Sequence, residues 1–262
     1  MNENNAVHRA VENRAGAVVP YLMLPREVVR ACGVPLHDAP PLGFAARIWS
    51  GKAWLPGELA GVFAFGTQPG GTGAPCVSAA ASRTVERTDL GAEVWDCADL
   101  RTVLRGAEFR GLVFALTTSH GDVVDVTPYP PAGALCAALE GVQGELDAWL
   151  EHPTVLLKSW AVSLVVSRFP WPNETNTPVG IGLLEQRVLR HFWSPADGLD
   201  GTVLTSDTLL GWATAWSDHL GNAVSRAGVT ARAVHAPGLQ YRLGAGRDLL
   251  NAWAEFKNAG MV

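Results

Sequence analysis

The stretch RGLVFALTTSHGDVVDVTPYP, residues 110–130, carries the strongest structural signal in this chain. Its first part, Leu112 to Thr118, is an apolar run with the length and the β-branched and aromatic content of a buried strand. The run ends at Ser119-His120-Gly121-Asp122, and a second β-rich run, Val123 to Thr127, follows directly. We therefore expect two strands joined by a turn, with a histidine at the end of the first.

His120 is the candidate functional residue in this stretch. A histidine at the end of a buried strand, beside a glycine, lies where open α/β sheets build their active sites. The motif is short, and the plain alternative is a histidine in the turn of a β-hairpin. The local sequence leaves both interpretations open.

Composition limits the class of protein. Of 262 residues, 48% are hydrophobic and 17% are charged, with a formal net charge of -5, so the chain has material for a large core. There are only three lysines, Lys52, Lys158 and Lys257, which argues against a broad nucleic-acid or membrane-binding surface. No apolar run reaches the roughly 18 residues of a membrane span, and the start lacks the apolar core of a signal peptide. We expect a cytoplasmic protein that does not contact a membrane.

The pattern along the chain predicts alternating strands and helices. Residues 1–56 form an N-terminal extension, and residues 57–262 form one domain. The apolar character of the runs near Val62, Leu112, Val155 and Leu164 predicts that these strands lie side by side in a mainly parallel sheet. The fold class is therefore α/β, a three-layer sandwich with helices on both faces. Further expected strands are residues 43–49 and 93–96, and the expected helices are residues 76–87, 98–108, 132–150, 179–192, 206–227 and 247–258.

The order of these elements resembles the caspase-like fold, which caspases, metacaspases and bacterial CHAT peptidases share. The resemblance covers residues 57–245, with TTSHGD (117–122) and ADGLDGTVLT (196–205) as its more specific motifs. It implies a cysteine peptidase, in bacteria often a proteolytic effector or adaptor of defence systems, that acts on or binds a protein or peptide. It implies no cofactor and no metal.

In that family a cysteine thiolate attacks the peptide carbonyl, a histidine transfers the proton and backbone N–H groups hold the oxyanion. The resemblance implies that His120 is the histidine and that the Gly121 N–H is an oxyanion donor, with His120 within about 10 Å of residues 159–162 at the strand ends. Asp122 and Glu174, together with Asp125, are the candidates for binding a basic substrate side chain near His120. The nucleophile belongs at Ala161 or, next best, at Trp160, and neither is a cysteine.

Three explanations of the missing cysteine remain open. The protein is a degenerate relative, or alanine replaces the nucleophile at position 161 in this sequence, or the resemblance extends to the fold only. The four cysteines, at positions 32, 76, 97 and 136, form no CxxC pair, which excludes the common zinc signatures. Cys76, at the start of an expected helix, is the best of them as a reactive thiol.

The alternative function is a non-catalytic α/β domain that binds a nucleotide or another small molecule, or that serves as a protein-interaction scaffold. It uses the glycine-rich loop Gly66 to Gly73 and the strand ends. That loop contains neither GK[ST] nor GxGxxG, so it is neither a P-loop nor a dinucleotide fingerprint.

Overall fold

The protein is described by a computed structural model. The described residues are 41–67, 75–85, 88, 94–118, 120–127, 132–141, 160–171, 173, 175–183, 191–194, 203–205, 207–242 and 244–262. Within them, no helix is both long and apolar enough to cross a membrane.

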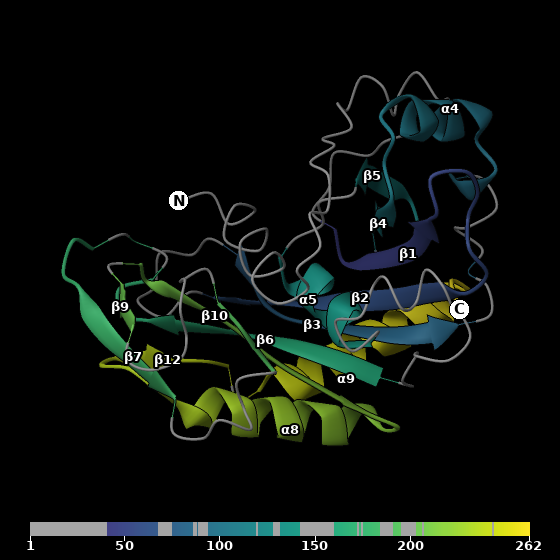
Figure 1. Cartoon of the computed structure of the whole chain (residues 1–262). Helices are drawn as coiled ribbons and strands as arrows, with labels where there is room; N and C mark the ends of the chain where they lie inside the picture. The colour runs from purple at the N-terminus through teal and green to yellow at the C-terminus, as the bar shows by residue number, and fades with distance from the viewer. Residues whose placement is uncertain are drawn as a thin grey trace.

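A large antiparallel sheet forms the body of the described structure (Figure 1). Its strand order is β5-β4-β1-β2-β3-β6-β10-β8, and β12 pairs with the far end of β6. Three short strands, β11-β7-β9, form a second sheet. The strands are β1 (Gly43–Trp49), β2 (Glu58–Thr67), β3 (Pro75–Val85), β4 (Gly111–Thr117), β5 (Val123–Thr127), β6 (Trp160–Arg168), β7 (Val179–Leu183), β8 (Phe192–Trp193), β9 (Val203–Thr205), β10 (Leu209–Ser217), β11 (Val234–His235) and β12 (Leu239–Gln240).

The prediction of a mainly parallel, caspase-like sheet is wrong. Every strand pairing in the described part of the chain is antiparallel. The expected central strands are also not neighbours, because β1 lies between β4 and β2, and β3 lies between β2 and β6. The fourth of them, near Val155, lies outside the described residues.

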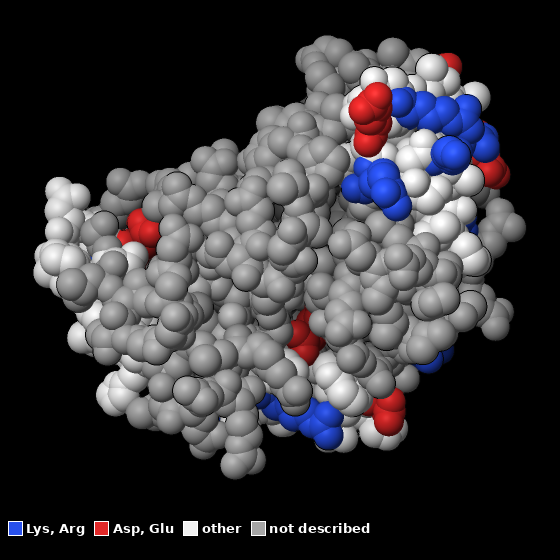
Figure 2. Space-filling view, in the orientation of Figure 1, with Lys and Arg blue, Asp and Glu red and all other residues white. Residues whose placement is uncertain are grey.

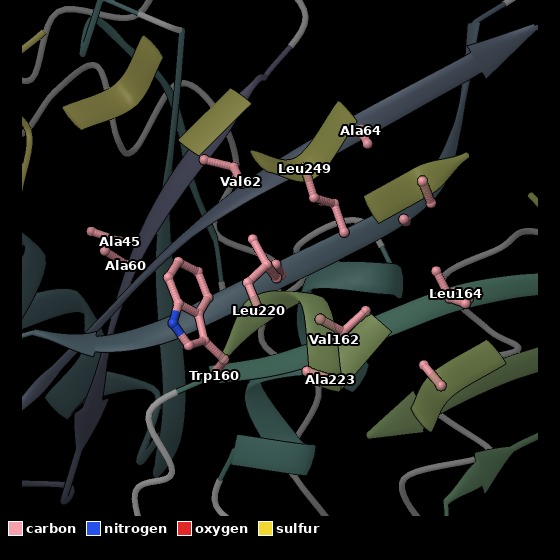
Figure 3. Packing of buried hydrophobic residues seen from close by; sticks show 14 of the residues in the cluster. Ala45, Ala60, Val62, Ala64, Trp160, Val162, Leu164, Leu220, Ala223 and Leu249 are labelled. Atoms are coloured by element: carbon pink, nitrogen blue, oxygen red, sulfur yellow. The ribbon is translucent and has the colours of Figure 1, made fainter. Parts of the chain in front are cut away.

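Helices cover both faces of the sheet, which explains why the strands are apolar throughout. Helices α8 (Leu220–Ala233) and α9 (Ala245–Asn258) pack on one face, and α5 (Ala132–Gly141) packs on the other (Figure 1). Figure 3 shows the core beneath α8 and α9, where Leu220 and Leu249 meet strand residues such as Val162. An antiparallel sheet buried on both sides needs the same continuous apolar strands as a parallel one, so this signal does not report strand direction.

Two expected helices are strands. The run from Cys76 to Arg87 is rich in alanine, which favours a helix, yet it forms β3, paired with β2 on one side and β6 on the other. Its small side chains allow α5 to pack closely on the sheet at this point. The second, from Val179, begins with β7. Tertiary pairing overrides local propensity at both places.

Other boundaries differ in detail. The expected helix at 206–227 is β10 followed by α8, and residues 94–95 of the expected strand 93–96 are helical. Helices α4 (Ala98–Gly106) and α9 confirm the predictions at those places. Strand β1 belongs to the sheet, although its residues fall within the expected N-terminal extension. The remainder of that extension before residue 41 lies outside the described residues.

Candidate functional site

The turn between β4 and β5 holds the residues of the predicted histidine site. Thr118 organises it: its N–H donates to the Asp122 carbonyl (2.9 Å), and its Oγ1 accepts from the N–H groups of His120 and Asp122, both at 3.2 Å. His120 and Asp122 are exposed. The local arrangement is therefore the hairpin turn that was the plain alternative for this motif.

Gly121 is needed in this turn for its conformation and for a close contact. Its φ is +93°, a region that favours glycine, and a Cβ there would lie 2.3 Å from the Met261 sulfur. The C-terminal Met261, itself buried, thus occupies the space over Gly121. A substrate carbonyl cannot approach that side of the glycine while Met261 lies there.

The other half of the predicted dyad lies in the interior of the sheet. Ala161 and Trp160 are buried at the start of β6. One row of paired residues crosses the sheet from the end of β4 to this point: Thr117, Gly43, Val62, Ala81 and Val162. Four strand spacings of about 4.8 Å separate β4 from β6, so Thr117 and Val162 are about 19 Å apart across the sheet, whereas about 10 Å was expected between His120 and residues 159–162.

Among the residues that the structure describes, no other predicted site residue lies at this turn. Glu174 and Cys32 lie outside the described residues, as do residues 68–74 of the glycine-rich loop. Cys76 belongs to β3 and does not start a helix. Cys97 is half-buried before α4, and Cys136 is buried in α5.

The sheet face beneath α5 presents a different group of polar side chains. Asp125 and Thr127 alternate along the edge strand β5, so both point to one face, opposite Leu116 and Phe114 of β4. That face is the one on which α5 packs. The Asp125 Oδ1 accepts a hydrogen bond from the Val126 N–H at 2.8 Å. Carboxylate and hydroxyl oxygens at this spacing suit a hard cation such as Mg²⁺.

A buried carboxylate joins α5 to the far side of the same face. The Glu140 Oε1 lies 2.7 Å from the His191 Nδ1, and its Oε2 accepts from the Thr214 hydroxyl at 2.6 Å. Glu140 is 3% exposed and Thr214 is fully buried. The hydroxyl also lies 2.9 Å from the His191 carbonyl, which already accepts from the Thr214 N–H at 2.7 Å. This Glu140 network connects α5, β10 and the residue before β8.

Sequence reasoning missed the Glu140 network. One acidic residue in an otherwise small and apolar helix was the available signal, because a carboxylate is rarely buried without a partner. Its partners His191 and Thr214 are distant in sequence, and nothing local identifies them.

Positive charge is scarce on this face. Among the described strand residues that point toward α5 there is no lysine or arginine, since strand alternation places Arg47, Arg83 and Arg168 on the opposite face. The described residues also contain no group of three or more His, Cys, Asp or Glu side chains placed to hold a metal.

Comparisons with known proteins identify the fold. No family model matches the sequence, and no curated protein matches it. Among solved structures, phosphoribosylamine–glycine ligase from Thermotoga maritima matches with a TM-score of 0.52 and 16% identity, over 78% of this chain and 55% of that one. Urea amidolyase from K. lactis matches with a TM-score of 0.50 and 10% identity, over 90% of this chain and 15% of that one.

The chain thus spans about half of the ligase and a small part of the amidolyase. These are ATP-grasp proteins with an antiparallel sheet, not caspase-like proteins. The caspase-like resemblance and the peptidase function are therefore wrong, and with them goes the reason for assigning His120 and Ala161 to a dyad. The fold of this chain is therefore similar to that of these ATP-grasp proteins, and the similarity extends to the fold alone.

Proposed function

We propose that this chain is a nucleotide-binding domain that binds ATP with Mg²⁺ and does not catalyse ligation. The similarity to an ATP-grasp ligase over 78% of the chain carries the proposal. The non-catalytic nucleotide-binding function that the sequence left as an alternative agrees better with this fold than a peptidase does.

Asp125 and Thr127 are the described residues best placed to hold the metal. They offer two oxygen side chains on one face of an edge strand, at the end of the sheet. Mg²⁺ usually keeps several waters and binds through one or two carboxylates together with the nucleotide phosphates, so a cage of protein ligands is not required. The side chains present suit such a shared site.

The lack of described lysine and arginine side chains on the sheet face toward α5 is the reason that we do not propose catalysis. Transfer of a phosphoryl group needs cations around the developing charge, commonly a lysine or arginine beside Mg²⁺. The described strand residues toward α5 supply none. Binding needs fewer such contacts than transfer, because only interactions that strengthen in the transition state accelerate the reaction.

Isothermal titration of the full chain with ATP in the presence of Mg²⁺ tests the proposal. We expect saturable binding that weakens by about tenfold or more in Asp125→Asn, because a charged ligand is lost. Asp122→Asn is the matched control: it removes the same charge from the exposed turn three residues earlier and should leave affinity unchanged. We expect no ADP release above the level of free ATP. Absent binding, or equal losses in both variants, would contradict the proposal.

A further inference from the structure

A group of cations gathers on the lobe that contains α4 (Figure 2). It consists of Lys52, Arg101, Arg105 and Arg110, which we call the arginine patch. All are exposed except Arg101, which is partly exposed. Within the described residues none of the four pairs with a carboxylate.

The backbone around Lys52 positions two of the arginines. Ser50 closes a tight turn, in which its Oγ donates to the Ala53 carbonyl at 2.8 Å and accepts from the Ala53 N–H at 3.1 Å. The carbonyl of Lys52 in that turn accepts from the Arg105 guanidinium at 3.1 Å, and this guanidinium lies 5.8 Å from the centre of the Trp49 ring. The side chain of Arg110 crosses Gly51, with its Cγ 3.2 Å from the position of a Cβ there. Three cations therefore surround one rigid turn.

Arg101 extends the patch along the helix. It lies one turn before Arg105 on the same face of α4, and its guanidinium donates to the Asp96 carbonyl at 2.6 Å. Like charges four residues apart weaken an isolated helix, by roughly 0.2–0.5 kcal/mol. Arg105 also lies in the last turn, where a cation favours the helix dipole, so that residue has a structural role as well. The dipole does not account for Lys52, Arg101 or Arg110.

We propose that the arginine patch binds a short acidic segment of a partner protein. Planar guanidinium groups fixed by other contacts lose little freedom when they bind carboxylates in pairs of hydrogen bonds. The local positive charge stands out on a chain of net charge -5. Three acidic residues, Asp96, Asp99 and Glu108, are exposed on the same lobe and would repel a continuous polyanion. The Trp54 ring is not free to stack on a base, because its Nε1–H donates to the Trp95 carbonyl and the ring packs between two other indoles. These features favour a short acidic peptide over a nucleic acid.

Fluorescence anisotropy with a labelled short peptide of alternating glutamate and glycine tests the inference. We expect saturable binding that weakens with added salt, and a loss of about tenfold in the triple variant Lys52→Gln, Arg105→Gln, Arg110→Gln. The control is Arg232→Gln, Arg247→Gln, Lys257→Gln, which removes the same charge from exposed positions on α8 and α9 and should change affinity less than about twofold. Melting temperatures confirm that both variants fold.

Three results would overturn the inference. The first is an absence of peptide binding at low salt. The second is an equal loss in both triple variants, which would mean that binding follows net charge. The third is a thymidine oligonucleotide of equal charge that binds more tightly than the peptide and depends on the patch, which would make the partner a nucleic acid.

Discussion

The Glu140 network makes a quantitative prediction about stability. Thr214→Val removes only the hydroxyl and leaves the Glu140 Oε2, 2.6 Å away, without that donor in a buried place. A buried acceptor that loses its donor costs about 1–3 kcal/mol. We expect Thr214→Val to lower the free energy of unfolding by about that amount.

Substitutions of Glu140 itself separate hydrogen bonding from burial. In Glu140→Gln the side-chain amide N–H donates to the Thr214 hydroxyl, and that hydroxyl donates in turn to the His191 carbonyl 2.9 Å away. The amide oxygen still faces the His191 Nδ1. Glu140→Gln should therefore lower the free energy of unfolding by less than about 1 kcal/mol, because each polar group keeps a partner. Glu140→Ala removes all of these contacts as well as packing and should cost about 2–4 kcal/mol.

A double-mutant cycle isolates the interaction. In a Glu140→Leu background Thr214→Val should lower the free energy of unfolding by almost nothing, so the coupling between the two sites should be about 1–3 kcal/mol. Urea denaturation monitored by tryptophan fluorescence measures all of these variants. If Thr214→Val has the same effect with and without Glu140, or if Glu140→Ala is harmless, the carboxylate does not hold α5 against β10.

Three further substitutions test the packing and the turn. Gly61→Ala places a Cβ 2.0 Å from the Phe44 ring and 2.6 Å from the Ala81 carbonyl, so it should lower the free energy of unfolding by about 1–3 kcal/mol or more. The control Gly106→Ala, whose Cβ has nothing within 4 Å, should be neutral or slightly stabilising. Equal denaturation midpoints for the two variants would contradict the register of β1 and β2. Gly121→Ala should lower the melting temperature, because the position has a φ of +93° and a Cβ there would clash with Met261. Met261→Ala should relieve part of that loss. Thermal melts of the two single variants and the double variant would show this as non-additivity.

Local sequence predicted those elements whose pattern and environment agree. Helix α9 and helix α4 combine a clear apolar stripe with a glycine or cysteine boundary, and both bury that stripe. Strands β4 and β5 follow from β-branched residues around a turn with glycine. Strand β3 could not be predicted in this way, because its alanines favour a helix and only pairing with β2 and β6 makes it a strand.

Strand direction was the decisive error. The run from Leu112 to Thr117 is buried on both faces, which the sequence shows, but the coverage comes from helices packed on an antiparallel sheet. At the site, the sequence pattern indicated His120, which is exposed in the turn, and indicated Asp125 only as a possible substrate-binding neighbour of that histidine. The importance of Asp125 depends on its alternation with Thr127 on the face toward α5, which requires knowledge of the sheet.

Hydrogen exchange of the full chain, with and without ATP and Mg²⁺, tests the central claim most directly. If the nucleotide binds at the β5 edge, on the face of the sheet that also carries α5, amides of β5, residues 123–127, should exchange more slowly in its presence. Amides of α8 on the opposite face should not change. Protection confined to α8 and α9, or no protection at saturating ATP, would contradict a nucleotide site on this face of the sheet.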